Sequence, residues 1–370
     1  MRKIKIGDKQ IGQDETIFII AEVGSNHDGK LEQAKKLIDI AAWAKVDAVK
    51  FQLFRASKLY PPTCGKILTL QGKIDVYKFF EQVELPYRWL PSLKKYAENQ
   101  DLIFIVTPFD EKSADVLEKI AVDIYKIASP ELNHLPLLQH IAKKQKPMIL
   151  SSGKSRLFDI EEAIDLIHRE NNHQVILLQC VGNCPAPLED YNLNVIETFK
   201  RAFRVPVGIS DHSLDPSLIP KLAVACGVSV VEKHFTLNKK LSGLDHPFAL
   251  EPDELKSMVK EIKKVEKWSK KKKKNFLNSK LSYKKILGTS QKIIAPSEKE
   301  LYPGDKRSIF VIKDIKRNEK LGKNNIAVLR GERHFRPGIH SRYFNLVLGK
   351  RATKSIKKYT GLQWEYLLTV

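Results

Sequence analysis

Short runs of apolar, often β-branched residues alternate with longer segments of helical periodicity through the first two thirds of the chain. The eight apolar runs occupy residues 17–24, 47–52, 102–109, 123–129, 147–153, 175–180, 205–211 and 228–235. Segments with apolar residues at helical spacing lie between most of them, at 31–45, 111–121, 135–145, 158–170, 193–203 and 216–227. Strands that are apolar throughout and that alternate with helices are typical of a parallel sheet buried on both faces.

Eight such strand–helix units in succession predict an α/β fold, a closed (β/α)8 or TIM barrel. The structural alternative is an open, doubly wound sheet, which usually has fewer strands. An open sheet of that kind would be expected to carry a glycine-rich dinucleotide loop, but no GxGxxG motif follows the first strand.

Polar side chains stand where most of the predicted strands end. In a barrel the carboxyl ends of the strands converge on one face, and active sites lie there. Read in order, the strand ends carry Glu22, Lys50, Gln52, Thr107, Lys126, Ser129, Ser151, Cys180, Ser210, Asp211, His212, Glu232 and His234. Lysines, hydroxyls and histidines gathered at one rim predict a phosphate-binding site with a metal beside it.

His212 and His234 follow the seventh and eighth strands, which are neighbours in a closed barrel. Two imidazoles at adjacent strand ends suit a divalent metal such as Mn²⁺, with water and substrate oxygens in the other positions. The alternative is a pair of hydrogen-bonded structural histidines.

Lys50 and Lys126 lie within the strand runs, where a lysine is rarely buried without a partner. Each could hold an anion as a point charge or act as a Schiff-base nucleophile. The four hydroxyls near the strand ends would donate hydrogen bonds to phosphate or carboxylate oxygens, although such residues also stabilise turns; they belong to Thr107, Ser129, Ser151 and Ser210.

Two carboxylates, Glu22 and Glu131, are expected on the same rim. Glu22 could transfer a proton near the reacting centre, and Glu131 could bind sugar hydroxyls, but either could instead pair with a lysine. Asp245 lies on a loop after the last strand, where a turn or helix-cap role is the alternative.

The formal net charge of +21 comes largely from lysines late in the chain, including the uninterrupted run 270–274. Because no aromatic residues interleave this run, it predicts a solvated face or linker rather than a nucleic-acid site. The chain has four cysteines, no apolar run long enough to span a bilayer and no secretory leader. We therefore expect a cytoplasmic protein without disulfides, nucleic acid or membrane partners.

Seven motifs, in chain order, resemble those of the N-acylneuraminate (sialic acid) synthase family: IAEVGSNHDG, VKFQLF, TPFD, YKIASPE, SDHS, EKHFTL and GLDH followed by LEPDEL. The resemblance reaches the tail, where RSIFVIKDI, RPG and VLGKRA are similar to the antifreeze-like (SAF) domain of those enzymes. It implies a barrel over residues 1–285, a linker at 286–305 and an antifreeze-like domain at 306–370.

The resemblance also implies a reaction, in which phosphoenolpyruvate condenses with an open-chain N-acylated hexosamine to give a nine-carbon 2-keto sugar acid and phosphate. By motif, phosphoenolpyruvate would be held by Lys50, Thr107, Lys126, Ser129, Ser151 and Ser210. The two histidines His212 and His234 would hold Mn²⁺, or Mg²⁺ or Co²⁺. The residues that would face the sugar or the attacking water are Glu22, Gln52, Glu131 and Asp245, and Arg336 would bind the sugar. Arg336 matches the family arginine that reaches a partner's pocket, so we expect a domain-swapped homodimer with a lid supplied in trans.

The chain departs from the family pattern on the sugar side. Cys184 stands where a sugar-binding tyrosine is expected and Gly182 where an asparagine is expected. The sugar could therefore be N-acetylmannosamine or a 2,4-diacetamido-trideoxyhexose, because loss of a large aromatic ring leaves room for a second N-acyl group. Two further alternatives are a Schiff-base pyruvate aldolase and a non-enzymatic basic binding module.

Overall fold

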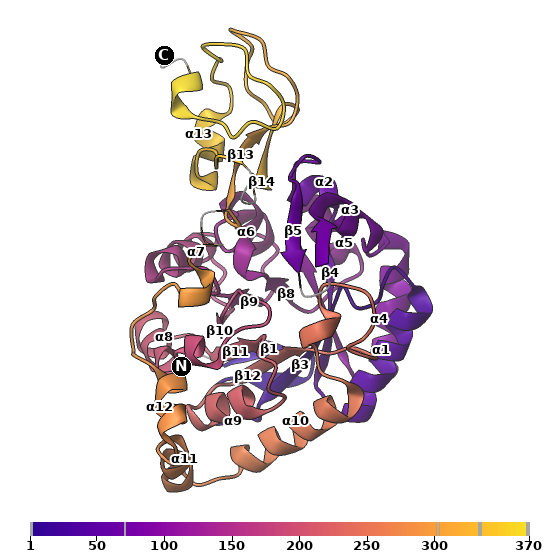
Figure 1. Ribbon diagram of the computed structural model, residues 1–370, viewed down its shortest axis with the longest axis vertical. Helices are drawn as coiled ribbons and strands as arrows, with labels where there is room; N and C mark the ends of the chain where they lie inside the picture. Colours follow the sequence, from indigo (N-terminus) through magenta and orange to yellow (C-terminus); the bar gives the residue numbers. More distant parts are fainter. Residues whose placement is uncertain (1–2, 70–71, 301, 303, 332–334, 368–370) are drawn as a thin grey trace.

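The computed structural model describes residues 3–69, 72–300, 302, 304–331 and 335–367. Eight parallel strands close into a barrel in the order in which they occur along the chain, which confirms the predicted fold (Figure 1). The strands are β3 (Phe18–Gly24), β4 (Ala48–Leu53), β7 (Ile103–Pro108), β8 (Tyr125–Ile127), β9 (Met148–Ser151), β10 (Val175–Cys180), β11 (Val207–Asp211) and β12 (Val230–His234). Each lies within one of the eight apolar runs, apart from Leu53 at the end of β4.

An outer layer of helices surrounds the strands (Figure 1). Six of them follow the predicted segments: α1 (Leu31–Ala44), α5 (Glu111–Lys119), α6 (Leu135–Ala142), α7 (Leu157–Arg169), α8 (Val195–Phe203) and α9 (Leu218–Ala225). The chain continues after β12 through α10 (Pro252–Glu266), α11 (Lys270–Leu277) and α12 (Leu281–Leu287).

The interval between β4 and β7 holds more structure than the sequence pattern indicated. It forms α2 (Ala56–Leu59), the antiparallel hairpin of β5 (Lys66–Thr69) and β6 (Gly72–Asp75), α3 (Val76–Gln82) and α4 (Leu90–Glu98). Only α4 covers the barrel in the usual way, with Leu90, Leu93 and Ala97 buried against it. The remainder stands as an insertion beside the carboxyl ends of the strands (Figure 1).

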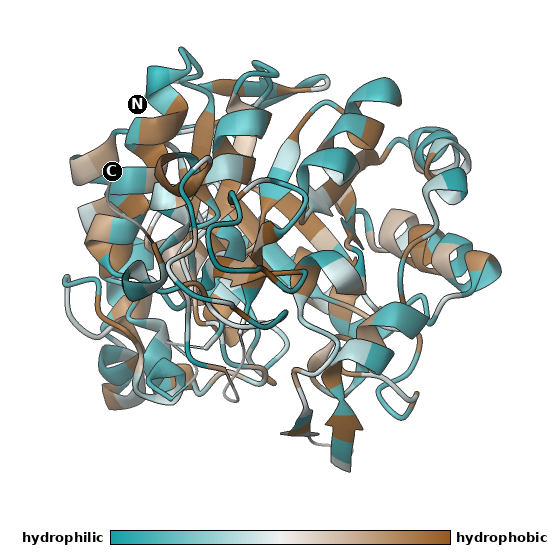
Figure 2. Cartoon of the chain, turned by 90° about the horizontal axis from the view of Figure 1, so that it is seen from above, coloured by the Kyte–Doolittle hydropathy of each residue, from teal (hydrophilic) through white to brown (hydrophobic). Residues whose placement is uncertain are grey.

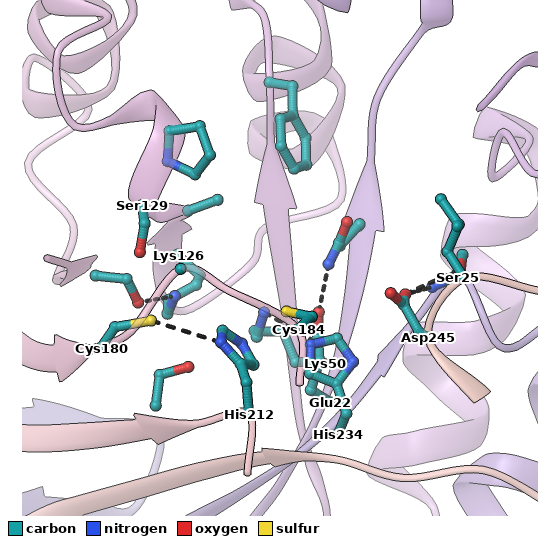
Figure 3. Close-up of a pocket in the computed structure, with 18 of the residues that line it drawn as sticks. Glu22, Ser25, Lys50, Lys126, Ser129, Cys180, Cys184, His212, His234 and Asp245 are labelled. Carbon is teal, nitrogen blue, oxygen red and sulfur yellow. Dashed lines mark hydrogen bonds and ion pairs between the residues drawn. The ribbon is translucent and has the colours of Figure 1, made fainter. Parts of the chain in front are cut away.

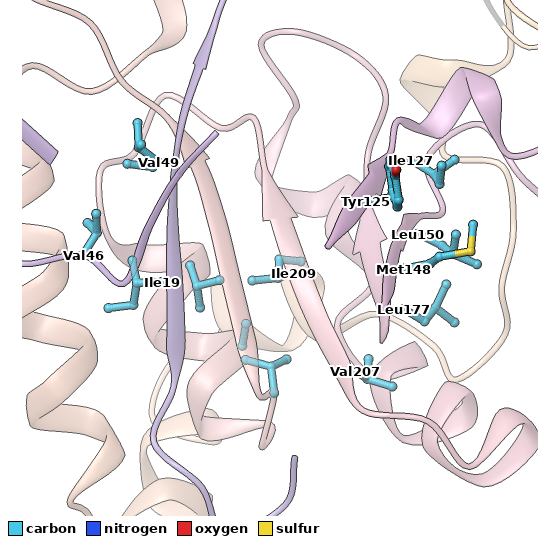
Figure 4. Close-up of a cluster of buried hydrophobic side chains, with 14 of the residues drawn as sticks. Ile19, Val46, Val49, Tyr125, Ile127, Met148, Leu150, Leu177, Val207 and Ile209 are labelled. Atoms are coloured by element: carbon cyan, nitrogen blue, oxygen red, sulfur yellow. The ribbon is translucent and has the colours of Figure 1, made fainter. Parts of the chain in front are cut away.

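Alternate residues of each strand face opposite sides of the barrel wall. Ile19, Val49 and Ile209 point outward into the core beneath the helices (Figure 4), whereas Ile20, Ile105 and Ile149 belong to a separate cluster inside the barrel. The inner cluster also contains residues of the hairpin formed by β1 (Ile4–Ile6) and β2 (Lys9–Ile11). Burial on both faces explains why the strand runs are continuously apolar, and Figure 2 shows hydrophobic residues concentrated in the strands.

The second, smaller domain is built on the antiparallel pair β13 (Arg307–Val311) and β14 (Ile326–Arg330), with the short helix α13 (Phe344–Val347). It has its own core, which includes Ile309, Val328 and Leu362. The domain sits over the end of the barrel near α6 and the β5–β6 hairpin (Figure 1). Among the described residues, no helix combines the length and apolar character needed to cross a membrane.

Candidate active site

A pocket of about 200 Å³ opens at the carboxyl ends of the barrel strands, beneath the small domain (Figure 3). Ten of the thirteen site residues expected from the sequence line this pocket: Glu22, Lys50, Gln52, Lys126, Ser129, Ser151, Ser210, His212, His234 and Asp245. Residues more than two hundred positions apart are therefore gathered at one rim.

One side of the pocket is rich in cations and hydroxyl groups. Lys126 Nζ donates to Ser151 Oγ at 2.7 Å, and Lys50 Nζ lies 2.8 Å from Glu22 Oε2. Ser129 Oγ accepts from the backbone N–H of Gly153 at 3.0 Å, which leaves its own proton free to donate. Lysines and hydroxyls in this arrangement suit an anion such as a phosphate or a carboxylate.

Glu232 lies between the two lysines, and we had assigned it no role from the sequence. Its carboxylate oxygens are 3.4 Å from Lys126 Nζ and 3.7 Å from Lys50 Nζ, and Ser210 Oγ donates to it at 2.9 Å. A signal was available, because Glu232 stands two residues before His234 and so faces the same side of β12.

The pKa values of the two buried glutamates of the pocket are shifted in opposite directions. Burial, with a further contribution from Glu232, raises the pKa of Glu22, although Lys50 opposes the rise. Burial also acts to raise the pKa of Glu232, but Lys126 and Lys50 outweigh it and lower this pKa to about 2. Glu22 is thus suited to hold or transfer a proton, and Glu232 remains an anion.

His212 and His234 meet at the other side of the pocket, with ring centroids 5.4 Å apart and both rings against Phe248. His212 Nδ1 lies 2.8 Å from the carbonyl oxygen of Val181 and donates to it, which leaves Nε2 with a lone pair. Burial acts to lower the pKa of His212, but negative charge on the sulfurs of Cys184 and Cys180 outweighs burial and raises this pKa, so the lone pair on Nε2 becomes available when the ring loses its proton.

His234 carries a buried polar atom without a hydrogen-bond partner, as Glu22 and Glu232 also do. Its Nδ1 is buried without a hydrogen-bond partner among the described residues, and burial lowers the pKa of its ring to about 3. Gly24, at φ 57°, makes room beside it: a Cβ there would lie 2.5 Å from Asp245 Oδ2 and 3.0 Å from His234 Nδ1.

The donor set fits a divalent ion in part. Two ring nitrogens, one on each histidine, could serve as ligands. The described residues contain no group of three or more histidine, cysteine, aspartate or glutamate side chains placed to hold one ion. A metal at this position would therefore complete its coordination with water or substrate oxygens, the arrangement expected of a catalytic rather than a structural site.

A buried tyrosine fixes the backbone at His212. Tyr191 Oη accepts from the backbone N–H of His212 at 2.7 Å and donates to Asp211 Oδ1 at 2.5 Å. Since Tyr191 is fully buried, this contact holds the position of His212 from behind the pocket.

The remaining wall of the pocket is apolar. It consists of Leu59, Phe79, Phe80 and Phe109, which come from the insertion and from the end of β7. Cys184 is exposed at the opposite edge, near His212 (Figure 3). Apolar side chains beside so polar a site indicate that part of the substrate is itself apolar.

Glu131 occupies a different position from the one expected. It does not line the pocket; instead it is fully buried, and its oxygens accept from Arg307 Nε at 2.8 Å and from the guanidinium of Arg330. Both arginines belong to the small domain, so Glu131 joins the two domains and has little capacity left for sugar hydroxyls. Of the alternatives considered for Glu131, ion pairing describes this structure, although the partners are arginines rather than a lysine.

Thr107 and Arg336 also lie outside the described lining of the pocket. Thr107 is fully buried and accepts from Lys50 Nζ at 3.4 Å, so it contacts a residue of the pocket from behind. Arg336 is exposed, whereas Arg330, from β14, lines the pocket of its own chain. The guanidinium of Arg330 lies over the ring of Phe109 and donates to Tyr60 Oη at 3.1 Å. Arg336 was expected to reach the pocket of a partner subunit, and that stays a prediction; Arg330 is an additional pocket-lining arginine that the sequence motifs did not indicate.

A (β/α)8 barrel whose strand ends bring lysines, hydroxyls and paired histidines into one pocket is a scaffold for chemistry on a small anionic substrate. The chain belongs to the NeuB family, whose model matches residues 37–274. A SAF domain model matches residues 306–368, the small domain. The family resemblance found in the sequence is confirmed.

The relatives of the chain include nonulosonic acid synthases. It is 35% identical to the N,N'-diacetyllegionaminic acid synthase of Campylobacter jejuni, over 92% of this chain and 97% of that protein. It is 32% identical to the pseudaminic acid synthase of the same species, over 94% of this chain and 96% of that protein. The spore coat polysaccharide biosynthesis protein SpsE of Bacillus subtilis is 41% identical over 100% of this chain and 98% of its own length. The crystal structure of SpsE superposes with a TM-score of 0.86 at 40% identity, covering 100% of both chains.

Proposed function

We propose that this protein condenses phosphoenolpyruvate with the open-chain form of an N-acylated hexose and with water. The methylene carbon of phosphoenolpyruvate forms a bond to the aldehyde carbon, the oxygen of water adds to the neighbouring carbon, and phosphate leaves. The product is a nine-carbon 2-keto sugar acid, and the protein is a transferase. The observation that carries this proposal is the meeting of an anion-binding group and two available imidazole nitrogens in one pocket.

In this mechanism the cationic side of the pocket binds phosphoenolpyruvate. Lys126 and Lys50 neutralise its phosphate and carboxylate, and the hydroxyls of Ser129, Ser151 and Ser210 donate hydrogen bonds to the remaining oxygens. Without substrate, both lysines contact Glu232, and bound phosphoenolpyruvate would replace these contacts. Glu22, whose carboxyl accepts from Gln52 at 2.7 Å, is placed to receive or supply the proton of the attacking water.

His212 and His234 would hold the divalent ion, for which Mn²⁺ is the first candidate and Mg²⁺ or Co²⁺ are alternatives. When bound, such an ion supplies Lewis-acid stabilisation of the charge that develops on the aldehyde oxygen. The contact of His212 Nδ1 with Val181 orients the ring for this role.

For the sugar, we favour a 2,4-diacetamido-trideoxyhexose over N-acetylmannosamine. The apolar wall of Leu59, Phe79, Phe80 and Phe109 suits a methyl group and a second N-acyl group better than additional hydroxyls. The names of the two Campylobacter jejuni relatives support a product of the legionaminic or pseudaminic type. The use of that product in a cell-surface polysaccharide is in line with the name of SpsE. The cytoplasmic location and the domain-swapped homodimer stay predictions.

The test is release of phosphate from phosphoenolpyruvate across a panel of N-acylated hexoses, with Mn²⁺ and with a chelator. We expect release only when both an aldehyde sugar and the metal are present, and fastest release with a diacetamido-trideoxyhexose. Release without any sugar, or no release with every sugar and metal, would contradict the proposal.

One observation favours a second candidate function, a Schiff-base aldolase acting on pyruvate. Burial lowers the pKa of Lys126, as it does for lysines that act as nucleophiles. Treatment with borohydride in the presence of pyruvate separates the two functions, because only the aldolase would form a reduced pyruvate adduct on Lys126. We expect no adduct.

A further inference from the structure

A second concave surface lies at the opposite end of the barrel from the candidate active site. This surface, which we call the α11 groove, has a volume of about 1030 Å³ and runs between residues 12–17, the end of α8, residues 224–229 and α11. The lining includes Val207, the first residue of β11, and Val228, two residues before β12. The groove therefore faces the amino ends of the strands. In Figure 1, α11 is at the bottom of the molecule and the small domain is at the top.

Helix α11 turns three lysines and one leucine toward this groove. Lys270, Lys273, Lys274 and Leu277 line it, at the i, i+3, i+4 and i+7 positions of one helix face. Lys271 and Lys272 do not line it, and Lys272 lies over the ring of Trp268. The sequence predicts a solvated face or linker for this run, and within it the structure distinguishes a groove side from an outer side.

The carboxylates of the groove are largely occupied by other partners. Glu15 pairs with Lys3, Glu197 pairs with Arg201 at 2.8 Å, and Glu266 accepts from the backbone N–H of Ile17. Four lysines of the lining lie on α11 or just before it: Lys267, Lys270, Lys273 and Lys274. By contrast with the carboxylates, none of these lysines forms a salt bridge within the described part of the chain. Asp14 is a carboxylate of the lining that forms no salt bridge among the described residues, but the four lysines outnumber it, and their excess gives the concavity a positive potential.

The lining of the groove limits what could fill it. Ile17, Val207, Val224, Val228 and Leu277 give it an apolar component, and its described lining contains no aromatic ring on which a nucleic-acid base could stack. A flat bilayer surface would contact the rim of the groove but would not fill its interior. A second copy that presented the same lysine-rich face of α11 would be repelled by the lysines of the groove.

We propose that the α11 groove binds an acidic peptide segment of a partner protein, with carboxylates on the lysines and apolar side chains on the floor. Because the groove is at the far end of the barrel from the candidate active site, binding there leaves the mouth of the pocket open. This proposal does not depend on the proposed function, since it would hold for any activity at the other end of the barrel.

The test uses fluorescence anisotropy of the full chain with a labelled peptide of nine glutamates interrupted by three leucines. The groove variant K270E/K274E is compared with K263E/K271E, which changes the net charge equally at exposed positions outside the groove. We expect saturable, salt-sensitive binding that falls roughly tenfold in the groove variant and less than about twofold in the matched control. Phosphate release should be unchanged in both variants.

Three results would overturn the proposal. Equal loss in the two variants would mean that only net charge matters. Absence of saturable peptide binding would mean that an acidic peptide is not a ligand of the groove. Tighter groove-dependent binding of labelled oligo(dT), or of phosphatidylserine vesicles, would identify a different class of partner. Circular dichroism of both variants checks that each is folded, so that a loss of binding reports on the groove itself.

Discussion

Asp211 and Lys233 form a buried ion pair that ties the strand leading to His212 to the strand that carries His234. Lys233 Nζ lies 2.5 Å from Asp211 Oδ2, the side chains are at most 1% exposed, and the two residues are direct partners in the register of β11 and β12. Each stands immediately before one of the histidines. The pair therefore sets the relative position of the two rings from the outer side of the barrel wall.

Lys233→Met should lower both the stability of the fold and the affinity for metal. Removing one partner of a buried pair leaves the carboxylate of Asp211 without its main counter-charge, at a cost of about 3–5 kcal/mol. Urea unfolding and Mn²⁺ titration calorimetry measure the two effects. Lys221→Met is the control: its contact with Glu261 is 3.9 Å long and partly exposed, so the expected loss is at most about 1 kcal/mol. Equal losses in both variants would contradict a special role for the buried pair.

Lys126→Ala should weaken binding of phosphoenolpyruvate. A hydrogen bond to a charged group contributes about 1.5–3 kcal/mol, so we expect KM for phosphoenolpyruvate to rise roughly 10- to 100-fold. KM for the sugar should change little, because Lys126 lies on the anion side of the pocket. Steady-state kinetics with each substrate varied in turn makes the distinction, and exposed Lys143→Ala provides the control. An effect confined to the sugar would reverse our assignment of the two sides.

Arg330 lines the pocket, and its forked guanidinium donates to both Glu131 and Tyr60. A lysine cannot keep both contacts, so Arg330→Lys should disturb this part of the pocket wall and raise KM for the sugar. Arg336→Ala is the comparison, since Arg336 is exposed in a single chain. We expect the larger effect from Arg330→Lys. A larger effect from Arg336→Ala, together with a dimer in light scattering, would instead support a lid supplied in trans.

Because of Glu131, the free energy of unfolding of the chain should fall at acidic pH. Burial acts to raise its pKa, but Arg307 and Arg330 outweigh burial and hold the pKa well below its ordinary value. A depressed carboxyl pKa adds stability that is complete above the unfolded value of about 4.3 and declines as the pH falls below it. Wild type should therefore exceed Glu131→Gln in Tm at pH 7, with the difference narrowing by pH 3. Glu98→Gln, which removes a contact with Lys94 on the surface of α4, should show little difference at either pH.

The barrel was predictable from sequence because its strands are buried on both faces, so that each appears as an uninterrupted apolar run. The pocket was largely predictable for a related reason, since parallel strands place their carboxyl ends at one rim whatever the helices between them do. Contacts between the two domains were not predictable from the sequence. Glu131 lies just after a strand, as a catalytic carboxylate could, and only the arrangement of the small domain shows that Arg307 and Arg330 occupy it. Arg330 was missed for the same reason, because no local pattern distinguishes a pocket-lining arginine on β14 from an exposed one on a loop.

In the proposed mechanism, an ion-binding pair of histidines and an anion-binding pair of lysines act together on two substrates in one pocket. Crystals grown with Mn²⁺ and phosphoenolpyruvate, with diffraction recorded at the manganese absorption edge, test it most directly. We expect one anomalous peak within coordination distance of a ring nitrogen on both His212 and His234, and phosphate density in contact with Lys126. A manganese peak elsewhere, or phosphoenolpyruvate bound away from Lys126, would contradict it.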